Sequence, residues 1–254
     1  MARAMVNGLL ESGALSPPDV TVSSRTRSRM APLTERWPEI ETTTDNHLAA
    51  RSDMLFICVR SEQAPAVLDE IRPSLSPSTH VVLVNSGVAI DDIADVAVSK
   101  AIPSITIEAG RGVTLIHHGR HVGPEGRRRL ERLFSSVGRV MMMDEQRIDT
   151  ATALTSCGPA FMATFVDLFA RSAQERGFSY DEALAMLTET FMGTAMLLDA
   201  GRSPPWICNS VATEGGITEK GLEAMRRELP PMFDEMMSIV LREHRRTGRE
   251  VGGR

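Results

Sequence analysis

The first half of the chain alternates short apolar runs with stretches of helical periodicity. Residues Asp19–Ser24 alternate at period two, whereas Asp53–Val59 and His80–Gly87 are almost continuously apolar, which is typical of strands covered on both faces. Further strands are predicted at Ser99–Gly110, Gly112–Gly119 and Arg139–Asp144, and helices at Met1–Glu11, Ser61–Ile71 and Gly123–Gly138. Because strands alternate with helices, we expect right-handed crossovers and a mostly parallel sheet.

After Asp144 the period-two runs end and long helical stretches take over. Helices are predicted within Glu145–Gly177, Tyr180–Gly201 and Thr218–Arg246, with interruptions at Ser156–Ala160, Ser203–Pro205 and Pro230–Pro231 and a basic tail, residues 242–254, that we expect to fray. This change of pattern predicts a domain boundary near residue 143. The predicted fold is an α/β dinucleotide-binding domain over residues 1–143 followed by an all-α domain over residues 144–254.

The composition is that of an ordinary globular protein. The net charge is −5, with 42% hydrophobic and 24% charged residues, which excludes a disordered chain and argues against a strongly basic nucleic-acid surface. No run approaches about 18 consecutive apolar residues, so no membrane-spanning helix is expected. The three cysteines stand far apart without metal-ligand spacing, which predicts reduced thiols and a cytoplasmic location.

Three arginines follow the strand predicted at Asp19–Ser24, which corresponds to the second strand of a dinucleotide-binding fold, in the run Ser23-Ser24-Arg25-Thr26-Arg27-Ser28-Arg29. In a dinucleotide-binding fold, an acidic residue after this strand binds the ribose 2′-hydroxyl of NAD, whereas arginine accommodates the 2′-phosphate of NADP. A solvated loop of charges is the alternative for such a run taken alone. Its place in a series of strands and helices favours a phosphate site, with guanidinium forks and short hydroxyls as donors.

No glycine-rich fingerprint precedes the first helix. In this fold a G-x-G-x-x-G/A loop follows the first strand and opens the first helix, whose amide groups then meet the pyrophosphate. The sequence begins inside that helix, so the central strand has no counterpart in it. Two explanations stand: a natural start upstream of Met1, which we expect, or a domain impaired for cofactor binding.

Two stretches of small residues stand out in the helical half. Val211–Leu222 contains a Gly-Gly pair that runs into a helix start, where free amides and the helix dipole bind a carboxylate or a phosphate. Thr155–Phe161 places small residues and a proline inside a helical region, which lets another backbone or a ligand approach closely. An ordinary capped helix start and a helix kink are the purely structural alternatives.

The sequence offers no convincing nucleophile or metal ligand set. Cys157 has no histidine near it in the helical half before His244, so we expect a buried small residue rather than a catalytic thiol. His117 and His118 are adjacent on a predicted strand and point to opposite faces, and neither they nor His121 have a cysteine or carboxylate at ligand spacing. We therefore expect neither a metal site nor a hydrolase.

At the two small-residue stretches, the chain resembles the pyrroline-5-carboxylate reductase family, and the match runs over nearly its whole length. The family motifs SGSGPAY and SPGGTT, the latter followed by Gly-Leu, have counterparts in Ser156–Phe161 and Thr213–Leu222, and Met1-Ala2 looks like the end of the family's GxGNMA loop. The resemblance implies a Rossmann-type NADP-binding domain, here without its first strand, and a helical dimerisation domain. The residues that it implies for cofactor binding are Ser24, Arg25, Thr26, Asn46, Cys58, Val59, Arg60 and Gly87.

The resemblance also implies a reaction. NADPH, with NADH as the alternative donor, would reduce the C=N bond of Δ1-pyrroline-5-carboxylate to give L-proline. The substrate carboxylate would lie at Gly215, Gly216, Ile217 and Thr218, and the Thr218 hydroxyl would be the catalytic group that orients the imine and assists its protonation. In the family the helical halves of two subunits interlock, so a homodimer or higher homo-oligomer is expected. The methionines that fit such an interface, or equally a core, are Met186, Met192, Met196, Met232, Met236 and Met237.

Four residues depart from the family motifs: Ser104, Thr106, Cys157 and Glu214 stand in place of Asn, Pro, Gly and Pro. They make the chain look closer to the family's late-competence branch than to the housekeeping proline enzyme. A carboxylate at Glu214 that points inward would disfavour an anionic substrate. A catalytically weak homologue with a regulatory or competence-related role is therefore the alternative function. A hydroxy-acid dehydrogenase is disfavoured, because the long helix near residue 160 lacks a catalytic Lys or His.

Overall fold

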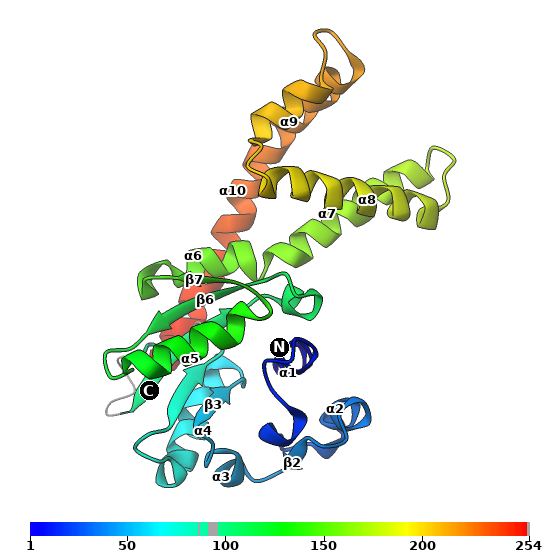
Figure 1. Cartoon of the computed structure of the whole chain (residues 1–254). Coiled ribbons are helices and arrows are strands. Elements are labelled where there is room, and N and C mark those ends of the chain that lie inside the picture. The colour runs from blue at the N-terminus through cyan, green and yellow to red at the C-terminus, as the bar shows by residue number, and fades with distance from the viewer. Residues whose placement is uncertain (86, 91–95, 253–254) are drawn as a thin grey trace. The chain divides into compact units, whose positions relative to one another are not determined.

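The computed structural model of the chain describes residues 1–85, 87–90 and 96–252, and in residues 247–252 it describes the backbone alone. By packing, the chain divides into two compact units (Figure 1). The first unit contains Met1–Pro159 together with Val240–Arg254, and the second contains Ala160–Ile239. The domain boundary that the change of sequence pattern predicts near residue 143 stays a prediction.

The first unit contains two separate sheets. The larger sheet has five strands in sequence order, and β6 is antiparallel to β5 while every other neighbouring pair is parallel. A second sheet pairs β1 and β2 in parallel. The strands are β1 (Thr21–Ser23), β2 (Glu41–Thr43), β3 (Met54–Ile57), β4 (His80–Leu83), β5 (Ala97–Pro103), β6 (Gly112–His118) and β7 (Gly138–Met142). The mostly parallel arrangement that the sequence predicts is confirmed in these strands.

Helices cover both faces of the larger sheet. On one face, α1 (Ala2–Glu11) and α5 (Pro124–Ser135) enclose an apolar cluster that includes Met5, Leu9 and Phe134. On the other face, α4 (Ala64–Ile71) packs its Leu68 and Ile71 against a second cluster. The shorter helices α2 (Ala31–Arg36) and α3 (Asn46–Ala49) follow β1 and β2, respectively. β4 is buried at every position, which explains its continuous apolar run.

The structure corrects one predicted strand. Residues 104–110 were expected to continue the strand that begins at Ser99, but they form a 3₁₀ helix (Ile105–Ala109). The Ser104 hydroxyl accepts a hydrogen bond from the Thr106 amide and so caps this helix. Gly110 ends the helix in the left-handed region, at φ 66°. A local side-chain cap therefore replaces strand pairing after Pro103.

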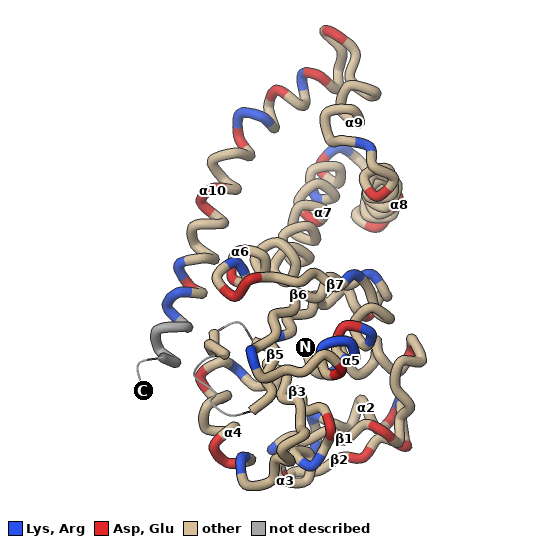
Figure 2. Tube along the Cα trace, turned by 60° about the vertical axis from the view of Figure 1, so that its left-hand side comes forward, with Lys and Arg blue, Asp and Glu red and all other residues tan. Residues whose placement is uncertain are grey.

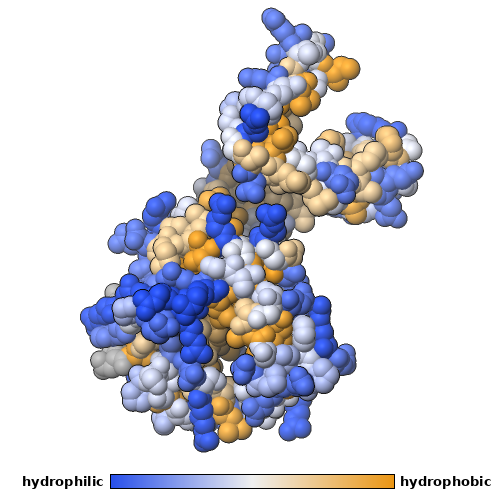
Figure 3. Space-filling model, in the orientation of Figure 1, coloured by the Kyte–Doolittle hydropathy of each residue, from blue (hydrophilic) through white to orange (hydrophobic). Residues whose placement is uncertain are grey.

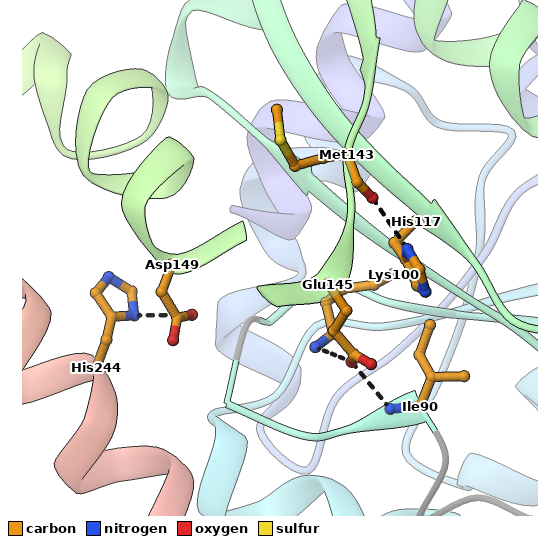
Figure 4. A network of polar contacts seen from close by, with 7 residues as sticks. All are labelled: Ile90, Lys100, His117, Met143, Glu145, Asp149 and His244. Atoms are coloured by element: carbon orange, nitrogen blue, oxygen red, sulfur yellow. Dashed lines mark hydrogen bonds and ion pairs between the residues drawn. The ribbon is translucent and has the colours of Figure 1, made fainter. Parts of the chain in front are cut away.

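A buried ion pair fastens the start of α6 (Glu145–Thr155) to the sheet (Figure 4). Lys100 Nζ lies 2.7 Å from Glu145 Oε1, and the Lys100 side chain is 3% exposed. The same oxygen accepts a 3.1 Å hydrogen bond from the Ile90 amide. Burial acts to raise the pKa of Glu145, but Lys100 and the Ile90 amide outweigh burial and hold the pKa below its usual value. The carboxylate therefore stays ionised at the beginning of the helix.

The remaining helices are α7 (Gly158–Gln174), α8 (Tyr180–Asp199), α9 (Pro204–Val211) and α10 (Ile217–Gly252). Three of them are long, as the sequence predicts, and the fourth, α9, is a short helix that the sequence analysis did not predict. Ser203–Pro205 is not a simple turn, because Ser203 caps α9 and both prolines occupy its first turn, where no amide donor is needed. The prediction that residues 242–254 fray is wrong as far as Gly252, since α10 continues through Pro230 and Pro231 to that residue. Near its end, His244 Nδ1 lies 3.7 Å from Asp149 Oδ1 (Figure 4).

The second unit buries few of its apolar side chains. Among its described residues, only Ala170 and Ala183 are buried apolar ones, whereas many large apolar side chains are exposed (Figure 3). By length and composition alone, Glu145–Gln174 could cross a membrane, although core helices of soluble proteins pass the same test. The exposed apolar residues of the unit include Leu168, Phe169, Met186, Met192, Met196, Trp206, Met225, Met232 and Phe233. A surface this apolar indicates an interaction face.

Candidate active site

A cavity of about 2070 Å³ lies in the first unit between β1 and β3. Seven of the eight residues that the resemblance implies for cofactor binding line it: Ser24, Arg25, Thr26, Asn46, Cys58, Val59 and Arg60. Gly87, the eighth, follows β4 and is not among the lining residues. The structure thus brings together residues from three parts of the chain that are separated by up to 36 positions.

The segment after β1 presents arginines to this cavity. Arg25 and Arg29 line it, whereas Arg27 does not, although all three side chains are exposed. A short turn sets this spacing, because the Thr26 amide donates to Ser24 Oγ at 3.3 Å and a 3₁₀ helix then spans Arg27–Arg29. Figure 2 shows basic residues gathered beside β1 and α3. Arg29, which was not among the predicted cofactor residues, therefore lines the cavity beside them. No carboxylate follows β1 directly.

Asn46 is held in place by a chain of hydrogen bonds. Ser23 Oγ donates to Asn46 Oδ1 at 2.7 Å, and Asn46 Nδ2 donates to both carboxylate oxygens of Glu70, at 3.2 and 3.3 Å. Both Asn46 and Glu70 line the cavity. Glu70 was not among the predicted residues, because it lies on α4, 24 positions away, and nothing local in the sequence pairs it with Asn46.

The end of β3 and the start of α1 complete the lining. Burial raises the pKa of the Cys58 thiol to about 12, so this cysteine is an apolar wall rather than a nucleophile. Ala2 and Arg3 line the cavity from the first turn of α1, which contains no acidic residue and whose N-cap, Met1, makes no side-chain cap. The amides and dipole of this turn favour an anion.

In the second unit, the four predicted substrate residues form one tight turn into α10. Gly215 is in the left-handed region at φ 70°, and a Cβ on Gly216 would collide with the Thr213 side chain and lie 2.8 Å from the Thr213 carbonyl oxygen, so both positions require glycine. The Gly216 amide donates to the Thr213 carbonyl at 2.8 Å. The amides of Ile217 and Thr218 have no partner within the described chain and stand at the open helix start.

The carboxylate that contacts this turn is Glu219, whereas the sequence analysis singled out Glu214. Glu219 Oε2 accepts a 2.6 Å hydrogen bond from the Gly215 amide. Glu214 makes no hydrogen bond or ion pair within the described residues. The signal that could have identified Glu219 is its spacing, because a carboxylate four residues after Gly215 falls in the first helical turn.

Of the other departures from the family motifs, Ser104 and Thr106 have side-chain partners within the described chain. Thr106 Oγ1 donates to Ser104 Oγ at 2.9 Å, so these two substituted residues contact each other. Ser156 Oγ donates to the Pro103 carbonyl at 3.4 Å, next to the break between α6 and α7. Cys157 is half-buried rather than buried as expected, and this burial raises its pKa, in keeping with an unreactive thiol.

Comparison with known proteins accounts for both parts of the chain. Residues 145–247 match the family model "Pyrroline-5-carboxylate reductase dimerisation", and residues 1–86 match "NADP oxidoreductase coenzyme F420-dependent". The chain is 32% identical to the pyrroline-5-carboxylate reductase of Methanobrevibacter smithii over 213 residues, which cover 80% of this chain and 84% of that protein. It is 26% identical to ComE operon protein 4 of Bacillus subtilis over 239 residues, covering 92% of this chain and 88% of that protein.

The fold comparison agrees with these matches. The crystal structure of Plasmodium falciparum pyrroline carboxylate reductase with NADP bound superposes with a TM-score of 0.88 at 18% identity, covering 97% of this chain and 94% of that chain. The predicted fold class, a Rossmann-type domain followed by a helical dimerisation domain, is confirmed. The chain belongs to the pyrroline-5-carboxylate reductase family, a family of NAD(P)H-dependent oxidoreductases.

Proposed function

We propose that this protein catalyses the NADPH-dependent reduction of Δ1-pyrroline-5-carboxylate to L-proline. The observation that carries the proposal is the cavity between β1 and β3, where Arg25, Thr26 and Arg29 stand together and no acidic residue follows the strand directly. A cavity wall with these arginines and no carboxylate suits a nucleotide with a 2′-phosphate better than one with a free 2′-hydroxyl. Family membership supports the reaction type.

The residues of the cavity fit a phosphorylated dinucleotide. Arg25, Thr26 and Arg29 would hold the 2′-phosphate, and Asn46, fixed by Glu70, would bind near the adenosine. The first turn of α1 would hold further phosphate charge. When bound, the nicotinamide supplies a hydride to the imine carbon.

The turn at Gly215–Thr218 would bind the other reactant. The free amides of Ile217 and Thr218 are donors for the substrate carboxylate at the positive end of α10. The Thr218 hydroxyl would donate a hydrogen bond to the ring nitrogen, which gains a proton as the C=N bond is reduced. Because no strong acid is involved, catalysis would depend on position and on a fixed electrostatic environment.

Self-association through the second unit is part of the proposal. The second unit exposes more large apolar side chains than the surface of a monomeric soluble protein usually does. The family model for dimerisation matches the same helices. We expect a homodimer at least, whose interface covers residues such as Phe169, Met196 and Trp206. The expected cytoplasmic location stays a prediction.

Thr218→Ala is expected to lower kcat/KM for pyrroline-5-carboxylate about 10- to 100-fold, because one hydrogen bond to the reacting nitrogen is lost. NADPH oxidation by the purified protein measures the effect. Thr218→Ser is the matched control: it keeps the hydroxyl and should keep most of the activity. Full activity of Thr218→Ala would remove this residue from the mechanism.

Glu219→Gln is expected to lower KM for pyrroline-5-carboxylate about fivefold and to leave kcat unchanged. The substitution keeps an acceptor for the Gly215 amide but removes a negative charge beside the substrate carboxylate, an exposed interaction of about 1 kcal/mol. Glu214→Gln is the matched control, since Glu214 makes no described contact. A larger effect of Glu214→Gln than of Glu219→Gln would mean that the sequence-based suspicion of Glu214 is right.

A catalytically weak homologue with a regulatory role is the second candidate function. The contact between Glu219 and the Gly215 amide favours it, because a carboxylate of the protein already uses one donor of the turn. The relation to ComE operon protein 4 is consistent with it. Absence of NADPH oxidation under conditions where the protein is folded and binds NADPH would favour this second function.

A further inference from the structure

Helix α4 presents one face to the cavity between β1 and β3. Gln63, Ala66, Val67 and Glu70 line the cavity, and their spacing in the sequence places them on the same side of the helix. The neighbouring side of the helix packs its Leu68 into the apolar core. The cavity wall formed by α4 is therefore apolar in its middle, with one polar side chain before the apolar pair and one after it.

Glu70 is fixed at this wall by the short helix α3, which contacts β1, β2 and α4 (Figure 1). Its two carboxylate oxygens accept hydrogen bonds from Asn46 Nδ2, and Asn46 Oδ1 accepts one from Ser23. An amide side chain has two donor hydrogens on its nitrogen and two acceptor positions on its oxygen. The contacts with Glu70 and Ser23 use the nitrogen and half of the oxygen, so Asn46 has little hydrogen-bonding capacity left for a ligand.

The Glu70 carboxylate has acceptor capacity to spare. Its two oxygens offer about four acceptor positions, and the contacts with Asn46 occupy two of them. Glu70 is exposed, lines the cavity and makes no ion pair within the described residues. Because a carboxylate accepts hydrogen bonds and donates none, the ligand group that meets Glu70 has to be a donor without negative charge.

The adenosine half of NADPH contains few groups that fit this description. Its 2′-phosphate is negative and would be repelled by a carboxylate, whereas Arg25 and Arg29 line the cavity at the segment after β1. The base carries an uncharged donor, the 6-amino group of adenine. The ring that carries this donor suits a wall with apolar surface next to a polar group, which is the combination that Ala66, Val67 and Glu70 provide.

We propose that Glu70 accepts a hydrogen bond from the adenine 6-amino group, and that Ala66 and Val67 supply the apolar surface beside the ring. Glu70 thereby selects adenine over a purine with a carbonyl group at the same position. Asn46 is a positioning residue that holds the carboxylate in place. This inference rests on the proposed use of NADPH, and it names the residue that determines which base the cofactor carries.

The test compares NADPH with deamino-NADPH, in which hypoxanthine replaces adenine, so that a carbonyl oxygen stands in place of the 6-amino group. Titration of the full chain with each nucleotide, followed by nicotinamide fluorescence, gives the two dissociation constants. We expect deamino-NADPH to bind about 10-fold more weakly, because one hydrogen bond to a charged group is lost and two acceptors face each other. Glu70→Gln should bring the two dissociation constants within about twofold, because a glutamine amide can accept from the amino group or donate to the carbonyl.

Glu62→Gln is the matched control. Glu62 also lines the cavity, just before α4, so this substitution removes the same charge near the nucleotide but should keep the preference for NADPH. Equal affinities of the wild type for the two nucleotides, as expected if Glu70 meets a ribose hydroxyl, would overturn the inference, and so would an unchanged preference in Glu70→Gln. A chain that binds neither nucleotide would overturn the proposed use of NADPH as well, so the two failures are distinguishable.

Discussion

The double substitution Arg25→Ala and Arg29→Ala is expected to raise the dissociation constant for NADPH about 100-fold and to leave that for NADH within about twofold. The two guanidinium groups line the same cavity, and a charge-assisted hydrogen bond to phosphate contributes about 1.5 kcal/mol or more. Two such bonds correspond to about two powers of ten in affinity. NADH has no 2′-phosphate and loses nothing at this position.

Arg27→Ala provides the control within the same five-residue segment, Arg25–Arg29. Arg27 is as exposed as its neighbours but does not line the cavity, so its removal changes the net charge without removing a phosphate contact. Titration of each variant with NADPH and with NADH, followed by nicotinamide fluorescence, separates the two effects. Equal losses for both nucleotides, or an Arg27→Ala effect as large as that of the double variant, would contradict a 2′-phosphate site here.

The sequence could predict which residues after β1 line this cavity, because they lie next to one another in the chain. Ser24, Arg25 and Thr26 follow a short strand with period-two alternation, and the end of a parallel strand fixes where they lie. Asn46 came from the family motif alone, and its partner Glu70 could not be predicted, because the contact joins two helices across the end of the sheet. Contacts of this kind depend on the tertiary fold, which no local pattern encodes.

The sequence analysis did not predict two elements, β2 and the 3₁₀ helix after Pro103, because polar side chains and a local cap determine their conformation. β2 (Glu41–Thr43) is a three-residue edge strand of largely exposed polar residues, so it has no apolar period. The 3₁₀ helix after Pro103 has an apolar pattern like that of a strand, and the Ser104 cap decides its conformation. The long helices α7, α8 and α10 were predictable because their periodicity extends over many turns.

Acidification from pH 7 to pH 4 is expected to reduce the free energy of unfolding by about 3 kcal/mol through His80 alone. His80 is 5% exposed, and burial, with smaller contributions from the charges of His118 and Arg129, lowers its pKa from 6.5 to about 4. Between these two pH values the unfolded chain binds a proton that the folded chain does not, so stability falls as the pH falls. A shift of this size corresponds to about 3 kcal/mol.

The hydrogen bonds around His80 explain why its proton is excluded. One arrangement satisfies three contacts: His80 Nε2 donates to Ser99 Oγ (2.8 Å), Ser99 Oγ donates to His118 Nδ1 (2.7 Å), and His118 Nε2 donates to Glu131 (3.2 Å). His80 Nδ1 is then an unprotonated nitrogen, buried against Gly126 with no partner in the described chain. A proton there would meet no acceptor. Burial also lowers the pKa of His118, against the opposing effect of Glu131, so that His118 contributes in the same direction.

His80→Gln separates this histidine from the general acid sensitivity of the chain. Glutamine can still donate to Ser99 but takes up no proton, so urea unfolding curves at pH 7, 6, 5 and 4 should show a pH dependence smaller by about 3 kcal/mol. His121→Gln is the matched control, because His121 is exposed and outside the buried chain of hydrogen bonds. Since the comparison uses the slope with pH, a loss of stability already present at pH 7 does not affect it. Parallel curves for the wild type and His80→Gln would show that His80 takes up its proton equally in the folded and unfolded chain.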